Sequence, residues 1–257
     1  MYLILRPKAK LLSSVACFEE ASLKAIGCGL IDTAATASAT TFLPELEASK
    51  PDIIVVTSTV SADLYVNALS RQATSQTDGV LNQQNTSDEL KEPVFIAVGS
   101  STAKKLLSQH SRVLQAKPSS SEGILACIAQ LRLEKANVAI LKGKGGRNLI
   151  NKALSEKGFK VTEFDLYERV LLKEAYYTQR FEADDIQCII ATSAEIIDAA
   201  YNFFEPDWLN EIQWIVVSKR TKQHLSALGA KHIFTSNGAT DSHLIAAANQ
   251  VKGSQHE

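Results

Sequence analysis

The feature that most constrains the fold is an internal repeat, because two halves of the chain carry similar patterns in the same order. A short β-branched run ends at Thr-Ser in IIVVTS (53–58) and again in IIATS (189–193). Each run leads into apolar residues at helical spacing. Self-similarity of this kind indicates two copies of one structural unit.

Two further pairs of segments follow in the same order. VFIAVGSSTAKKLLSQ (94–109) resembles WIVVSKRTKQHLSALG (214–229), each reading as a buried strand, a polar turn and a helix. The Ser-rich loop and helix of AKPSSSEGILACIAQL (116–131) then match FTSNGATDSHLIAAANQV (234–251).

The two copies differ at their ends. The first continues as strand, Gly-rich loop, helix and strand through NVAILKGKGGRNLINKALSEKGFKVTEFDLY (137–167), whereas the second has no such continuation before Glu257. The missing strand, turn, helix and strand stand at the start of the chain, in residues 2–36. The N-terminal segment is therefore expected to complete the second copy.

This pattern predicts an α/β protein with two similar parallel-sheet domains, one from residues 1–36 plus 171–257 and the other from residues 37–170. Strands of 4–6 residues alternating with longer helices are typical of a parallel sheet covered on both faces. One large doubly wound sheet is the alternative. Residues 70–92 are Gln/Asn/Ser/Thr-rich and have no counterpart in the other copy, so we interpret them as a surface insertion.

Composition narrows the class of protein. With 45% hydrophobic and 21% charged residues and a net charge of −1, the chain has neither a disordered composition nor the basic excess expected for nucleic-acid or anionic-membrane partners. Its four cysteines are scattered without metal-ligand spacing. No signal peptide or membrane-spanning run is evident, so we expect a cytoplasmic protein.

Polar turns follow the predicted strands at the edge where α/β proteins bind ligands. Each turn also opens a helix, whose free N–H groups favour carboxylate or phosphate. The simpler interpretation is that these Ser and Thr residues only cap helices. The candidates are Thr57, Ser58, Gly99, Thr102, Lys142, Gly143, Thr192, Ser193, Ser218 and Thr221.

Familiar catalytic motifs are absent from the sequence. KGKGGR (142–147) lacks the spacing of a dinucleotide fingerprint and the ending of a Walker A loop. There is no G-x-S-x-G, and the five histidines show neither metal-ligand nor triad spacing. The residues alone thus indicate a two-domain α/β protein with anion-binding turns and name no reaction.

The ordered set of motifs nevertheless resembles a known family. LILRP, VVTSTVSADLY, AVGSSTAKKL, ILKGKGGRNLINKALSEKG, FDLYERV, IIATSAEIID and VVSKRTKQHLSALG resemble uroporphyrinogen-III synthase across essentially the whole chain. No single motif is specific, but the order is. The resemblance implies two α/β domains joined by a two-stranded linker.

The reaction implied by the resemblance cyclises the linear tetrapyrrole hydroxymethylbilane to uroporphyrinogen III, with inversion of ring D. The hydroxyl on ring A leaves as water, ring D attacks through its substituted carbon, and a spiro intermediate fragments and recloses. The resemblance implies no metal or organic cofactor. We expect a monomer, with transient contact to hydroxymethylbilane synthase left open.

The resemblance also implies roles for individual residues. Tyr167 of FDLYERV would donate a hydrogen bond to the departing hydroxyl. The alternative is that Tyr167 is only a half-buried strand residue at the end of the linker. The family's Thr-Ser turns map onto Thr57, Ser58, Thr192 and Ser193, and its Gly-x-x-Thr-Ala turn maps onto Gly99, Thr102 and Ala103. The equivalent turn of the other domain keeps Thr221 but has Ser218 in place of Gly and Lys222 in place of Ala. The cationic candidates for binding substrate carboxylates are Lys142, Lys144, Arg147, Lys219, Arg220 and Lys222, followed by Arg6 and Arg169. For Lys219, Arg220 and Lys222 the alternative is a solvated helix start.

Two alternatives to this enzyme remain at this point. A non-catalytic binding protein for a small polyanion would use the same turns without needing Tyr167. A family member that has lost its activity would account for Ser218 and the long polar insertion.

Overall fold

The computed structural model describes residues 1–76, 92–145 and 148–253. The chain forms two compact units, Met1–Asp32 with Val170–Glu257 and Thr33–Arg169. We call them the discontinuous unit and the inserted unit. Among the described helices, none is both long and apolar enough to cross a membrane.

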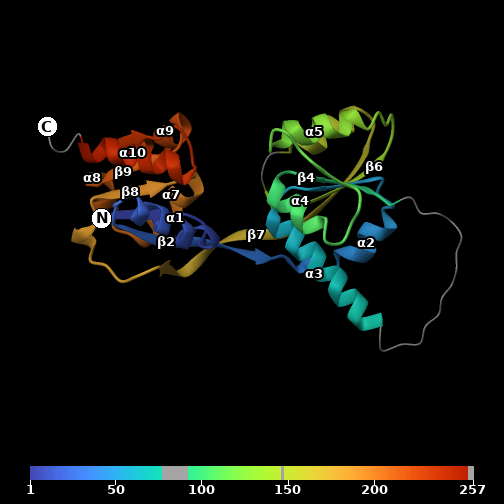
Figure 1. Ribbon diagram of the computed structural model, residues 1–257, viewed down its shortest axis with the longest axis horizontal. Coiled ribbons are helices and arrows are strands. Elements are labelled where there is room, and N and C mark those ends of the chain that lie inside the picture. Colours follow the sequence, from blue (N-terminus) through green and yellow to red (C-terminus); the bar gives the residue numbers. More distant parts are fainter. Residues whose placement is uncertain (77–91, 146–147, 254–257) are drawn as a thin grey trace, which may run out of the picture. The chain divides into compact units, whose positions relative to one another are not determined.

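The discontinuous unit alternates strands and helices (Figure 1). Its strands are β1 (Tyr2–Leu5), β2 (Ala25–Ala35), β8 (Cys188–Ala191), β9 (Gln213–Val216) and β10 (His232–Thr235). Its helices are α1 (Lys8–Glu20), η2 (Ala183–Asp185, 3-10), α7 (Ala194–Phe203), α8 (Pro206–Glu211), α9 (Lys219–Ala227) and α10 (Asp241–Gly253).

The inserted unit repeats this alternation. Its strands are β3 (Ile53–Val56), β4 (Val94–Ala97), β5 (Val113–Gln115), β6 (Asn137–Gly143) and β7 (Lys160–Tyr177). Its helices are η1 (Ala37–Thr40, 3-10), α2 (Phe42–Ala48), α3 (Thr59–Gln76), α4 (Ser100–Leu106), α5 (Ser121–Gln130) and α6 (Leu149–Glu156). Strands β2 and β7 are long and run from one unit into the other.

Strand order confirms the α/β class and the role of the N-terminal segment. The order is β10-β9-β8-β1-β2 in the discontinuous unit and β5-β4-β3-β6-β7 in the inserted unit. If β1 and β2 are counted after β10 in the chain, the five strands of each unit follow one another in the same spatial order. Pairing is parallel among β10, β9, β8, β1 and β2, and among β5, β4, β3, β6 and β7.

Strands β2 and β7 run in opposite directions along each other. The amide N–H of Thr36 donates to the carbonyl of Leu166 (3.0 Å), and the amide N–H of Thr178 donates to the carbonyl of Gly27 (2.9 Å). The first contact lies within the inserted unit and the second within the discontinuous unit. This pairing forms the predicted two-stranded linker.

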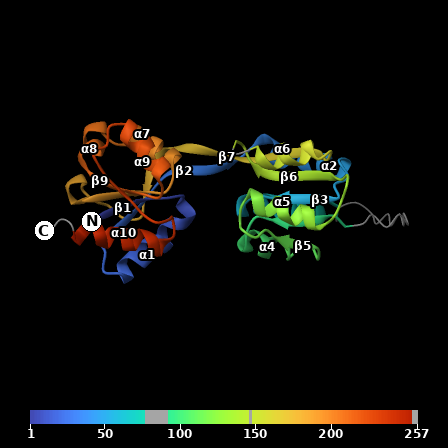
Figure 2. The ribbon, with the colours of Figure 1, turned by 90° about the horizontal axis from the view of Figure 1, so that it is seen from above.

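Each sheet is covered on both faces because its short strands are apolar on both sides. In the discontinuous unit, α7, α8 and α9 pack on one face and α1 and α10 on the other (Figure 2). In the inserted unit, α2, α3 and α4 pack on one face, while α5 and α6 pack on the other. Runs such as Ile53–Val56 are therefore fully buried.

The predicted surface insertion differs from the structure at its start. Residues 70–76 continue helix α3, where the Ser70 and Thr74 hydroxyls donate to the carbonyls of Val66 and Ser70. Such backbone bonding lets Ser and Thr stay in a helix despite their preference for turns. Residues 77–91 of the predicted insertion lie outside the described residues, and its last residue, Glu92, is described.

A histidine in the inserted unit gives a pH-dependent prediction. The His110 ring stacks on Phe95 with centroids 3.9 Å apart, and its Nε2 lies 3.0 Å from the Tyr65 hydroxyl. Burial lowers the pKa of His110 and outweighs the opposing effect of Glu92. Folding therefore favours the neutral form of His110, which contributes to the unfolding free energy at neutral pH. This contribution is lost as the pH falls below the pKa of His110 in the unfolded chain, about 6.5, and through its lower pKa in the folded protein.

We expect the difference in unfolding free energy between wild type and His110→Gln to shrink between pH 7.5 and 5. Urea unfolding at several pH values measures it. A difference that stays constant over this range would contradict the prediction.

Candidate functional site

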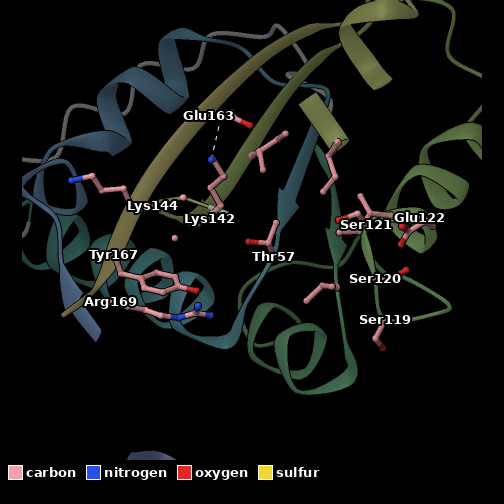
Figure 3. Close-up of a pocket in the computed structure, with 16 residues that line it drawn as sticks. Thr57, Ser119, Ser120, Ser121, Glu122, Lys142, Lys144, Glu163, Tyr167 and Arg169 are labelled. Atoms are coloured by element: carbon pink, nitrogen blue, oxygen red, sulfur yellow. Dashed lines mark ion pairs between the residues drawn. The ribbon is translucent and has the colours of Figure 1, made fainter. Parts of the chain in front are cut away.

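A cavity of about 410 Å³ lies at the carboxyl edge of the inserted unit's sheet. Its walls come from the residues that follow β3 and β4, from β6 and β7, from the loop before α5, and from α5 and α6 (Figure 3). The lining residues named in the figure are Thr57, Ser119, Ser120, Ser121, Glu122, Lys142, Lys144, Glu163, Tyr167 and Arg169.

Strand register brings these distant residues to one edge. Val56 pairs with Ala97 on one side and with Leu141 on the other, so the last residues of β3 and β4 lie level with Leu141 of β6, which continues to Gly143. The next residues along these strands, Thr57 and Lys142 among them, thus share the rim. This is the edge at which open α/β sheets bind ligands.

Tyr167 lines the cavity from β7, where it is half-buried. Its backbone carbonyl accepts a hydrogen bond from the Lys144 amide N–H (2.7 Å). In Figure 3 the phenol hydroxyl points into the cavity on the same side as the Arg169 guanidinium. A hydrogen-bond donor and a cation therefore face the same cavity.

Lys142 is held by two carboxylates of the neighbouring strand. Its Nζ lies 3.3 Å from Glu163 Oε2 and 3.3 Å from Asp165 Oδ1. Burial acts to lower the pKa of Lys142, but the carboxylates outweigh it, so the pKa is raised above its usual value. Lys142 therefore stays protonated at neutral pH, with its charge already balanced.

The loop before α5 also borders the cavity, although none of the candidate residues predicted from the sequence lies in it. Ser119 and Ser120 of this loop line the cavity, as do Ser121 and Glu122 at the start of α5. The Ser120 hydroxyl caps α5 by accepting from the Gly123 amide N–H (3.3 Å). The signal that could have found them was the Ser-rich loop of the third repeat. Glu163, also missed, carries no sequence signal, because only strand pairing brings it beside Lys142.

Of the predicted residues in the inserted unit, Thr57, Lys142, Gly143 and Tyr167 line the cavity. Ser58 accepts from the Ser61 amide N–H (3.0 Å), as a helix cap would. Gly99 precedes α4 in an extended conformation, and Thr102 is buried. Lys144 and Arg169 line the cavity as well, whereas Arg147 lies outside the described residues.

The predicted residues of the discontinuous unit sit at equivalent helix starts. Ser193 caps α7 through the Ile196 amide N–H (3.3 Å) and directly follows Thr192. Ser218 and Thr221 form a capping box, each side chain accepting from the other's backbone N–H. These contacts show the capping role, and a ligand-binding role for the four residues stays a prediction.

Four cationic candidates in the discontinuous unit have different surroundings. Lys219, Arg220 and Lys222 are exposed at the start of α9. Arg6 is instead buried and forms an ion pair with Asp241. Arg6 is therefore engaged inside its own unit.

Comparison with known proteins identifies relatives of the chain. Residues 13–246 match the family described as uroporphyrinogen-III synthase HemD. The uroporphyrinogen-III synthase of Escherichia coli K12 is 26% identical over 188 residues, which cover 70% of this chain and 76% of that protein. The match confirms the resemblance seen in the ordered motifs.

Solved structures agree with the fold. The Helicobacter pylori 26695 uroporphyrinogen-III synthetase has a TM-score of 0.57 at 18% identity, covering 97% of this chain and 99% of that one. A mutant uroporphyrinogen III synthase from the extremely thermophilic bacterium Thermus thermophilus has a TM-score of 0.55 at 14% identity and covers both chains fully. At these identities the likeness concerns the fold alone.

Proposed function

Because the chain belongs to the uroporphyrinogen-III synthase family, we propose that it converts hydroxymethylbilane to uroporphyrinogen III with loss of water and inversion of ring D. The observation that carries this proposal is the family match over residues 13–246. The chain would then be a cyclising hydro-lyase of tetrapyrrole and haem biosynthesis. The family match favours this function over a non-catalytic polyanion-binding protein.

Tyr167 is the proposed hydrogen-bond donor to the hydroxyl that leaves ring A. It is the phenol among the described residues that line the cavity, and it shares that cavity with cations that would hold the substrate. A phenol is a weak acid, so its contribution would be about 10- to 1000-fold. Most of the catalysis would come from holding ring D in the geometry that leads to inversion.

Carboxylate binding would be shared between charges and helix N-termini. The substrate carries eight carboxylates, and the cationic side chains among the described residues that line the cavity are Lys142, Lys144 and Arg169. The first turn of α5 adds backbone N–H groups and the Ser121 hydroxyl. To bind a carboxylate, Lys142 would exchange or share its contacts with Glu163 and Asp165.

The cavity is sized for part of this substrate. Ligand pockets span about 300–1,000 Å³, and a volume of about 410 Å³ lies near the small end. We infer that it receives the reacting end of the tetrapyrrole. We also propose that the enzyme is monomeric and cytoplasmic. Because its substrate is unstable, it would make transient contact with hydroxymethylbilane synthase, which supplies that substrate.

The isomer ratio of uroporphyrin formed from fresh hydroxymethylbilane tests the function. The uncatalysed closure gives type I, so an enzyme of this family is expected to give mainly type III. Product that is only type I would remove the enzyme proposal and favour the polyanion-binding alternative.

Tyr167→Phe tests the proposed donor. We expect kcat to fall about 10- to 1000-fold with little change in KM, because the hydroxyl acts when the bond breaks. The matched control is Tyr201→Phe, which removes a hydroxyl bonded to Asn210 (2.7 Å) in the discontinuous unit. An unchanged kcat in Tyr167→Phe would exclude this residue as the donor.

A further inference from the structure

The register between β6 and β7 changes beside the proposed donor. Lys142 pairs with Asp165, but the next residue, Gly143, pairs with Tyr167, so Leu166 has no counterpart. Such a β-bulge inserts one residue and changes the direction of a neighbouring side chain. Here it brings Tyr167 opposite a residue without a side chain.

The phenol head occupies the space that a side chain at position 143 would need. A Cβ placed on Gly143 would lie 2.5 Å from Tyr167 Cζ, 2.7 Å from Cε2 and 2.9 Å from the hydroxyl oxygen. All three distances are shorter than real Cβ contacts. The contact involves the hydroxyl end of the ring, which is the end that points into the cavity.

Conformational freedom does not explain this glycine. Gly143 avoids the left-handed region, whereas the nearby Gly145 has a φ of +82° and open space around its Cβ position. A residue with a side chain could therefore adopt the backbone conformation of Gly143. What excludes it is the Tyr167 ring.

We propose that Gly143 is a positioning residue, whose missing side chain sets where the Tyr167 hydroxyl lies in the cavity. It acts through Tyr167, in contrast to the direct substrate contact expected from its Gly-rich loop. The inference rests on the proposed function, because the hydroxyl matters only if it serves the reaction. Displacement of a reacting group by about 1 Å can cost about 100-fold in rate.

A double-mutant cycle separates this role from direct substrate binding. Gly143→Ala is expected to lower kcat by about 10- to 100-fold, with KM little changed. The share of type III isomer in the product should fall as well. In Tyr167→Ala, where the ring is gone, adding Gly143→Ala should cost nothing further. Losses that multiply in the double variant, or a wild-type kcat in Gly143→Ala, would overturn the proposal.

A spectroscopic readout makes the test independent of activity. With ring-labelled tyrosine, the NMR signal that disappears in Tyr167→Ala should move in Gly143→Ala. It should stay in place in Gly253→Ala, the matched control, where the added Cβ has nothing within 4 Å. A Tyr167 signal that does not move in Gly143→Ala overturns the proposal whatever the activity. If the signal moves but the wild-type protein has no synthase activity, only the proposed function is rejected.

Folding of the variants provides a further check. If Gly143→Ala does not fold, the double variant with Tyr167→Ala should fold, because the added methyl group then has room. A double variant that also fails to fold would show that the ring is not the obstacle, and would overturn the proposal.

Discussion

Gly123→Ala is expected to lower the unfolding free energy of the inserted unit by about 3 kcal/mol or more. A Cβ at this position would lie 1.9 Å from the Pro118 carbonyl oxygen and 3.0 Å from the carbonyl carbons of Lys117 and Pro118. All three atoms belong to the backbone, so no side-chain rotation can relieve the clash. Either the first turn of α5 or the loop before it has to move.

The same substitution is expected to raise KM for hydroxymethylbilane. The loop carries Ser119 and Ser120 and the first turn of α5 carries Ser121, and all three residues line the cavity. Displacement of either part would also disturb the cap that Ser120 places on α5. Initial rates at several substrate concentrations measure this effect in protein that remains folded.

Gly253→Ala is the matched control for stability. Gly253 ends α10, and a Cβ there has nothing within 4 Å, so we expect a change within about 0.5 kcal/mol. Urea unfolding compares the two variants. A loss in Gly123→Ala as small as that in Gly253→Ala would show that the loop adapts to the added methyl group.

The second large effect is expected for Arg6→Ala, with a loss of about 3 kcal/mol in unfolding free energy. Arg6 is only 7% exposed. Its guanidinium donates to the Ser14 hydroxyl (2.6 Å), to the Ala239 carbonyl (2.7 Å) and to the carboxylate of Asp241. It thereby ties the end of β1 to α1 and to the start of α10.

The loss is large because removal of Arg6 leaves its partners without their donor. Ser14 is fully buried and Asp241 is 29% exposed, so water replaces the lost contacts poorly. Arg6→Lys keeps the charge but not the fork that reaches three acceptors, and an intermediate loss is expected. Urea unfolding of both variants measures the difference.

Lys231→Ala supplies the comparison within the same unit. Lys231 forms an ion pair with Glu211, but both side chains are about 60% exposed. Exposed pairs of this kind contribute about 0–1 kcal/mol. Equal losses in Arg6→Ala and Lys231→Ala would contradict the role assigned to the buried arginine.

Arg6 also shows how far the sequence alone predicts the site. Arg6 follows β1 at the level where Leu5 pairs with Ala191, and Lys142 follows Leu141 at the level of Val56. The sequence places both cations at carboxyl edges of parallel sheets. Only packing distinguishes them, because Arg6 is enclosed by its own unit whereas Lys142 faces a cavity.

The sequence by itself determined the class of fold, the displaced repeat and the caps, because these depend on local patterns. Runs such as Ile53–Val56 specify buried strands, and Ser or Thr before apolar helical spacing specifies a helix start. The shared strand order follows from the repeat. Residues 70–76 were predicted to belong to the polar insertion but continue helix α3. Hydrogen bonds from the Ser70 and Thr74 hydroxyls to carbonyls of the same helix allow these polar residues to remain helical.

The cavity, in contrast, was decided by tertiary structure. Glu163 reaches Lys142 through pairing of β6 with β7, and Ser119 shares a cavity with Tyr167 although they are far apart in the chain. A one-residue bulge places the phenol over Gly143. Sequence spacing cannot show such contacts, because strand register and the space left by a missing side chain exist only after the strands have paired.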